Sequence, residues 1–185
     1  MAKRLQRKKT LVIDEERLKT VLKFIVIFNI LSLPMYLIMY LNYSYTPLQV
    51  FLTDVCYKFL NSLGYSTQLV RNTFCVVEAI KVPNLIQPIC ISWDSTGWKS
   101  VYALFSLALA TPIVTYRKKL KFLIIGLPTI FVLNVLRIVT TIILSINFGE
   151  QYFEVVHTVL WREGLIFAVV GIWFFWLWKE RHNSR

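Results

Sequence analysis

Three side chains of different chemistry could act together in this sequence: a thiol, a guanidinium and an imidazole. Cys90 opens a polar stretch, Arg137 interrupts an apolar run, and His157 lies in a polar loop. A histidine can take the proton of a thiol and later return it to a leaving amine, while the thiolate attacks a peptide carbonyl. An arginine stays charged in an apolar setting and can stabilise the oxyanion. The three residue types therefore predict cleavage or transfer of a peptide bond.

Arg137 is the most informative of the three, because the run around it is otherwise apolar. An arginine at the centre of a membrane helix costs about 2.5–3.5 kcal/mol on insertion scales, so such a residue usually has a function or a partner. Asn134 and Thr141 lie at i−3 and i+4 from it, which places all three on one helix face. We predict that this polar face lines a pocket. The alternative is an arginine that snorkels outward or binds carbonyls of a neighbouring helix.

Cys90 is distinguished from the other two cysteines by its neighbours. Cys56 lies on an amphipathic segment and Cys75 in an extended one. Residues 92–97, which include Asp94, are mostly small and polar and precede a helix start, whose dipole can lower the pKa of a nearby thiol. Two alternatives stay open: a single cysteine is often a small buried apolar residue, and three cysteines allow one disulfide and one free thiol.

His157 is one of two histidines, and the other, His182, lies in a basic C-terminal tail. A lone loop histidine is often incidental, so the interest of His157 lies in its place on the same side of the membrane as Cys90. Glu154 and His157 have the spacing of half a carboxylate-bridged metal site, but no second such pair follows. We predict no metal and no cofactor. The supporting or substrate-binding candidates are Asn134, Asp94, Thr141 and Arg162.

The composition indicates an integral membrane protein. Apolar residues make up 56% of the 185 residues and gather in long runs, which is the signature of membrane-spanning segments. The net charge is +11, and the basic residues gather beside those runs. They lie before the first run, in residues 117–121 and in residues 179–185. Basic clusters of this kind mark the cytoplasmic side and attract anionic lipids. Nucleic-acid binding is therefore not expected.

The pattern predicts one all-α polytopic membrane domain, residues 1–185, with four transmembrane helices. Residues 1–20 and 179–185 are expected to be cytoplasmic, and residues 42–97 and 149–163 extracytoplasmic. An amphipathic helix that ends at Gly64 is expected in the outer interface, followed by short strands or extended pieces in residues 65–91. The four predicted spans are residues 21–41, 98–116, 122–148 and 164–178.

This topology brings the three chemical side chains to one side of a cell membrane. Counting crossings from a cytoplasmic N-terminus places Cys90 and His157 outside. Arg137 lies fifteen residues after Phe122, or about 22 Å up the helix, in the outer third of a hydrocarbon core about 30 Å thick.

In these features the chain resembles the exosortase/archaeosortase family of membrane cysteine transpeptidases, and it would be a short form. Members carry a Cys at the outer start of one helix, an Asn-x-x-Arg motif in the next and a His before a later one. Here Cys90, Asn134-x-x-Arg137 and His157 occur in that order, within residues 88–167. One departure is that many members carry a small residue and Gly directly after the Cys, whereas Gly97 comes late in this chain.

The resemblance implies a sortase-like cysteine peptidase that removes a C-terminal sorting tag from exported proteins. Such a tag is a short motif, one transmembrane helix and a basic tail. Transfer of the new C-terminus to a membrane lipid or another amine acceptor is then expected. The catalytic residues would be Cys90 as nucleophile, His157 as acid–base and Arg137 as oxyanion donor.

Two other classes of protein fit parts of the pattern. In a non-enzymatic assembly or accessory subunit, the polar residues would fix helix packing and need not converge. A membrane acyltransferase could use His157, but no acidic His-x-x-x-x-Asp pattern follows that residue. Convergence of the candidate side chains in space separates the enzyme from the subunit.

Overall fold

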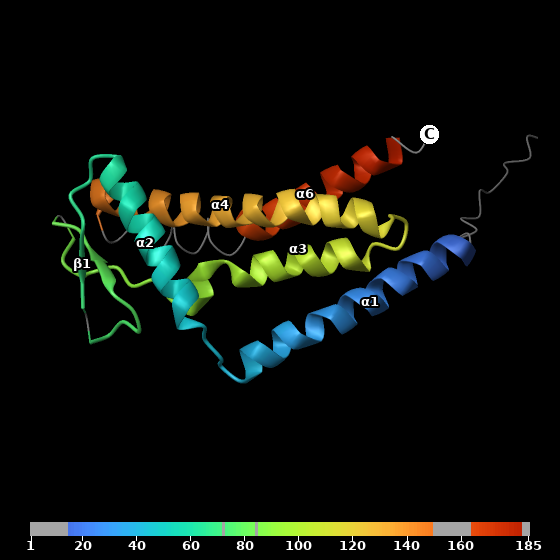
Figure 1. Cartoon of the computed structure of the whole chain (residues 1–185), viewed down its shortest axis with the longest axis horizontal. Coiled ribbons are helices and arrows are strands. Elements are labelled where there is room, and N and C mark those ends of the chain that lie inside the picture. The colour runs from blue at the N-terminus through green and yellow to red at the C-terminus, as the bar shows by residue number, and fades with distance from the viewer. Residues whose placement is uncertain (1–14, 72, 84, 150–163, 183–185) are drawn as a thin grey trace, which may run out of the picture.

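Helices form most of the chain in the computed structural model, which describes residues 15–71, 73–83, 85–149 and 164–182 (Figure 1). Two short strands, β1 (Gln68–Val70) and β2 (Ala79–Lys81), and one 3₁₀ helix, η1 (Trp93–Thr96), complete this part of the chain. The helices are α1 (Glu15–Tyr40), α2 (Thr46–Ser62), α3 (Trp98–Ala110), α4 (Tyr116–Phe148) and α6 (Gly164–His182).

Two of the described helices, α1 and α4, are long and apolar enough to cross a membrane. They have 26 and 33 residues, or about 39 and 50 Å at 1.5 Å per residue. The helix α3 is apolar but has only 13 residues, and α6 has 19. The structure is thus mostly helical, with two candidate spans among its described residues, where four were predicted.

The helix α3 is shorter than the span predicted at 98–116. It ends at Ala110 because Thr111 has extended backbone angles, φ −64° and ψ 109°, and precedes Pro112. A proline disfavours helical angles in the residue before it. The next helix begins at Tyr116, earlier than the predicted 122, so the basic residues 117–121 are helical rather than a loop.

The segment between α1 and α3 is built from α2 and a small antiparallel sheet. Pro47 lies in the first turn of α2, where its missing N–H costs nothing, and Gly64 follows the helix at φ +87°. The strands β1 and β2 then pair with Leu69 opposite Ile80, and Ile80 also bridges to Ile89. The predicted amphipathic helix and short strands are therefore both present.

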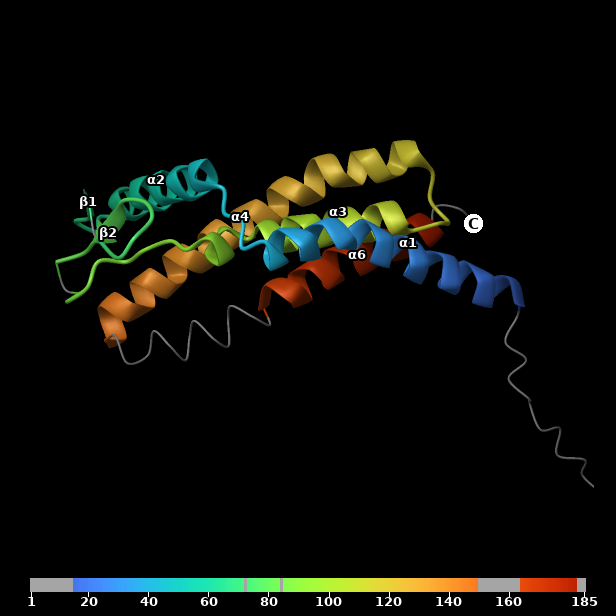
Figure 2. The ribbon, with the colours of Figure 1, turned by 90° about the horizontal axis from the view of Figure 1, so that it is seen from below.

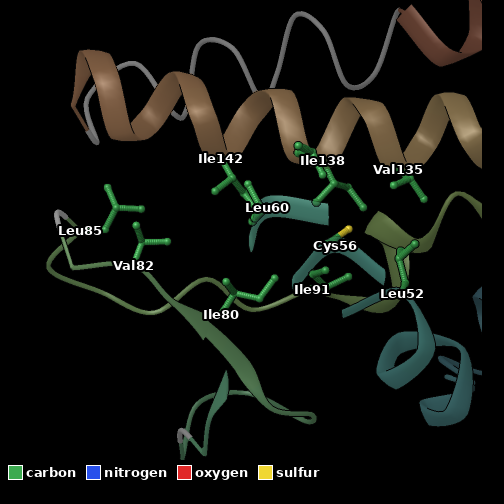
Figure 3. Packing of buried hydrophobic residues seen from close by; sticks show 11 residues of the cluster. Leu52, Cys56, Leu60, Ile80, Val82, Leu85, Ile91, Val135, Ile138 and Ile142 are labelled. Carbon is green, nitrogen blue, oxygen red and sulfur yellow. The ribbon is translucent and has the colours of Figure 1, made fainter. Parts of the chain in front are cut away.

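One buried cluster joins this segment to α4 (Figure 3). The apolar side chains of α2 face those of α4, and the end of the sheet segment packs beside them. Burial of these side chains removes apolar surface from water and fixes α2 across the end of α4. The buried residues of this cluster are Leu52, Cys56, Leu60, Ile80, Val82, Leu85, Ile91, Val135, Ile138, Val139 and Ile142.

The two ends of the helical layer differ in character. The helix α2 and both strands lie at one end, and the α3–α4 connection and the start of α1 lie at the other (Figures 1 and 2). Lys118 forms an ion pair there with Glu180 of α6. The helix α3 packs against α1, α4 and α6 and so lies at the centre of the layer.

Candidate active site

The turn that leads into α3 is pressed against α4. Gly97 forms the N-cap of α3 with φ +77°, a left-handed conformation that favours glycine. A Cβ at this position would lie 2.7 Å from Cγ of Asn134, closer than real Cβ contacts allow. Gly97 therefore permits both the turn and the close approach of α4.

Two side chains of α4 hold this turn by its backbone. Asn134 Nδ2 donates to the carbonyl oxygen of Ser95 at 3.2 Å, and Arg137 Nη2 donates to the same oxygen at 3.4 Å. Asn134 is 1% exposed, and its Oδ1 is buried with no hydrogen-bond partner among the described residues. Thr141 Oγ1, also buried, donates to the carbonyl of Arg137 at 3.0 Å. The polar face predicted on this helix thus lies against residue 95.

The side chains of the turn form their own local contacts. The hydroxyls of Ser92 and Ser95 are hydrogen-bonded, with 2.9 Å between the Oγ atoms. Asp94 is exposed and pairs with Lys99 at 2.7 Å, so it points away from the α4 contact. The rings of Trp93 and Trp98 stack with centroids 5.2 Å apart. Ser95 is half-buried between these groups and α4.

The three cysteines are in two different states. Cys90 forms a disulfide with Cys75, which closes a loop with a sequence separation of 15. Cys56 is a free thiol, completely buried in the cluster between α2 and α4, and desolvation by burial raises its pKa to about 12. A thiolate is the reactive form of cysteine. Cys90, the predicted nucleophile, would need reduction of the disulfide before it could act.

The segment around Cys90 is held by backbone pairing as well as by the disulfide. Ile89 exchanges two backbone hydrogen bonds with Ile80, both 2.9 Å. On the other side, Gln49 Nε2 of α2 donates to the carbonyl of Ile91 at 3.2 Å, and the Ile91 side chain is buried in the core cluster. Cys90 itself is exposed between these anchored neighbours. This segment has the features of a structural disulfide.

Two hollows lie along α4, one between α4 and α6 and the other between α4, α2 and α3. A cavity of about 250 Å³ is lined by Arg137 and Thr140 together with apolar residues of α4 and α6. An open groove of about 690 Å³ runs between α2, α3 and α4, and its walls are almost entirely apolar. Thr96 and Trp98, which flank the turn, line this groove.

Of the predicted site residues, Asn134 and Arg137 of α4 contact the turn at Ser95, while Thr141 donates to the Arg137 carbonyl of its own helix. His157 and Arg162 lie outside the described residues. No group of three His, Cys, Asp or Glu side chains that could hold a metal gathers within the part of the chain that the structure describes.

A family model for the transmembrane exosortases matches residues 11–181 of the chain. The chain belongs to the transmembrane exosortase family. No curated protein and no solved structure matches it. The family is one of cysteine-peptidase-like membrane proteins with a general role in transpeptidation and protein sorting, and the chain is accordingly a membrane protein of that class.

In the sequence, Ser95 stood out only as one of the small polar residues 92–97 that follow Cys90. The structure instead makes it the residue that this exosortase holds with Asn134 and Arg137. One signal in the sequence pointed there: Thr96 and Gly97 directly follow Ser95, whereas Ile91 and Ser92 follow Cys90. In this chain, the small residue and glycine that many similar proteins carry directly after the Cys are found after the serine.

Proposed function

We propose that this exosortase cleaves a C-terminal sorting tag from exported proteins by acyl transfer at the turn before α3. The observation that carries the proposal is the donation from Arg137 of α4 to the Ser95 turn. A permanent cation within an apolar helix is energetically costly, so it usually serves a function. Stabilisation of an oxyanion at this turn would be such a function. The products would be a shortened protein, joined to a lipid or another amine acceptor, and the released tag.

The proposal includes four crossings and a reaction on the outer face of a cell membrane. The helices α3 and α6 would cross beside α1 and α4, which leaves residues 42–97 outside and both termini in the cytoplasm. The ends of the helical layer support this orientation, because the start of α4, with its basic residues 117–121, and the C-terminal end of α6 lie away from α2 and the sheet (Figure 1).

The short α3 also suits a substrate that is itself embedded in the membrane. Thirteen residues span only about 20 Å, less than the hydrocarbon core of about 30 Å. The turn at the start of α3 would then lie below the outer surface, where the transmembrane helix of a tag ends. The apolar groove lined by Thr96 and Trp98 could receive that helix.

Acyl transfer needs a general base as well as a cation. His157 is our candidate for this role, and it would take the proton of the nucleophile and return it to the leaving amine. His182, the last residue of α6, lies beside the α3–α4 connection, at the other end of α3 from the turn, and serves as the control.

Co-expression with tagged reporters tests the proposed function. Each reporter would be an exported protein that ends in a short polar motif, an apolar helix and a basic tail taken from the same genome. Mass spectrometry of the reporter would show a new C-terminus upstream of the apolar helix. We expect His157→Ala to reduce processing by about 10²–10⁴-fold and His182→Ala to leave it near wild type. Uncut reporters throughout the panel, with wild-type protein folded in the membrane, would refute the proposal.

A further inference from the structure

We propose that the hydroxyl of Ser95 is the nucleophile of this exosortase, in place of a cysteine thiol. The inference rests on the proposed function and names the residue that attacks the substrate. It is carried by the state of the three cysteines and by the contacts that α4 makes with the Ser95 turn.

The cysteines are poorly placed for attack. Cys75 and Cys90 are joined to each other, and the outer face of a cell membrane is an environment in which disulfides persist. Cys56 is 0% exposed and packs among apolar side chains of α2 and α4, so no substrate can reach its sulfur. The chain contains three cysteines, and all of them are therefore accounted for.

The oxyanion machinery lies at residue 95. Arg137 Nη2 and Asn134 Nδ2 both donate to the carbonyl oxygen of Ser95, which places the guanidinium within a few ångströms of that residue. A guanidinium carries five N–H donors in a planar fork, so it can hold the turn and also donate to an oxygen beside it. A substrate carbonyl attacked by Ser95 Oγ would develop its negative charge beside this cation.

The local backbone supplies further stabilisation. Gly97 caps α3 without a side-chain hydrogen bond, so the first N–H groups of the helix receive no capping oxygen from the cap residue. These groups and the helix dipole favour negative charge near the helix start. The Oγ of Ser92 lies 2.9 Å from that of Ser95 and can orient its hydroxyl. Ser95 is only half-buried, which leaves its side chain accessible.

The reaction balances without a redox step. Ser95 Oγ attacks the carbonyl carbon of the scissile peptide bond, and the hydroxyl proton passes to the general base of the proposed reaction. The C–N bond then breaks, the base returns the proton to the leaving amine, and an ester of Ser95 remains. An acceptor amine or water next attacks this ester, and the serine hydroxyl regains its proton from the base.

The test compares substitutions of serine and cysteine in the full-length protein, with the tagged reporter as substrate. We expect Ser95→Ala to reduce processing by at least about a thousandfold, as loss of a nucleophile does in serine peptidases. Ser66→Ala, an exposed serine of the outer segment, should leave processing unchanged. The double variant Cys75→Ala/Cys90→Ala should retain processing within about tenfold.

Ser95→Cys provides the positive control for folding and chemistry. This variant should process the reporter, and N-ethylmaleimide should inhibit it while leaving the wild type active. Processing by Ser95→Ala at the wild-type rate would overturn the proposal. Loss of processing in the folded cysteine double variant would also overturn it, and would assign the attack to Cys90 while leaving the proposed function intact.

A second measurement needs no substrate and so separates the two proposals. A fluorophosphonate probe should modify wild-type protein at Ser95, as located by peptide mass spectrometry, and Ser95→Ala should lose this label. Modification at Ser95 without reporter cleavage would support the nucleophile and count against the sorting function. Absence of the label in a wild-type protein that cleaves the reporter would refute the serine nucleophile alone.

Discussion

Two neighbouring segments between α2 and α3 of this exosortase carry reactive residue types, and they are held in opposite ways. The segment around Cys90 is fixed to the sheet, to α2 and to Cys75, and its sulfur is consumed in a covalent bond. The turn around Ser95 is fixed to α4 through a cation and an amide. The first segment is built for stability, and the second places a hydroxyl where charge can be stabilised.

The partner of a residue can indicate a functional site better than the intrinsic reactivity of that residue does. A cysteine is intrinsically more nucleophilic than a serine, but its usefulness depends on being free and ionised. The costly feature of this chain is the arginine within an apolar helix, and its contact marks residue 95. Each of the following predictions separates the two segments.

The largest expected effect concerns Arg137. Substitution to Lys should reduce reporter processing by two to three decades, because one well-placed oxyanion donor contributes about 3–4 kcal/mol to transition-state stabilisation. A lysine lacks the planar fork and loses its charge more readily when buried. Turnover should be measured at matched membrane expression, with the melting temperature in detergent as the check on folding.

Arg71→Lys is the matched control, because Arg71 is exposed directly after β1 and should tolerate the change. A stable Lys variant at position 137 with wild-type turnover would show that the arginine only ties α4 to the turn. The backbone amides of residues 92–97 would then become the first candidates for the oxyanion donors.

Gly97 and Gly64 offer a second comparison, with a smaller expected effect. Both have left-handed backbones, at φ +77° and +87°, so alanine at either costs about 1–2 kcal/mol of conformational strain. Only at Gly97 would the new methyl group collide with Asn134, while nothing lies within 4 Å of that position at Gly64. We expect Gly97→Ala to lower both the melting temperature and the rate of processing. Processing should fall by about tenfold or more, because a small displacement of catalytic groups reduces the rate by at least that much.

Gly64→Ala should lower the melting temperature slightly and leave processing unchanged, because Gly64 ends α2 away from the turn. Equal losses of processing in the two variants would mean that the fit between Gly97 and α4 has no role in catalysis. Circular dichroism of both variants would confirm that the helices remain.

The sequence predicted the helical membrane class and the helix α2, because long apolar runs and the spacing of Leu52 and Phe59 are local signals. It also predicted the polar face of Asn134 and Arg137, since these residues share one helix. The predicted end of α3, at residue 116, was wrong. Apolar residues continue past Pro112, and this favoured a longer span, but the helix ends at Ala110, just before that proline.

The contact between α4 and Ser95 could not be derived from local pattern, because it depends on which residues meet in space. Arg137 and Ser95 are separated by 42 positions in the chain, and nothing in either segment alone specifies the contact. The pairing of Cys75 with Cys90 also requires the sheet, since Cys75 lies in the connection between β1 and β2 and Cys90 directly follows Ile89, which bridges to Ile80 of β2. Three cysteines in a sequence allow several pairings, and only the fold selects one.

The smallest effect on activity is expected from breaking the disulfide, and it gives the sharpest separation of the two segments. Cys75→Ser and Cys90→Ser remove the same covalent bond, whose loop of sequence separation 15 corresponds to about 3 kcal/mol of stabilisation in the chain-entropy account. Both variants should therefore melt at the same lower temperature.

If Ser95 is the nucleophile, both should also process the reporter at the same rate, within a few-fold of wild type, when assayed well below that temperature. If Cys90 is the nucleophile, the pair splits: Cys75→Ser would release an active thiol and Cys90→Ser would abolish processing. Wild-type protein treated with dithiothreitol completes the comparison, because reduction alone should reproduce the two variants under the serine mechanism and should raise activity under the cysteine one.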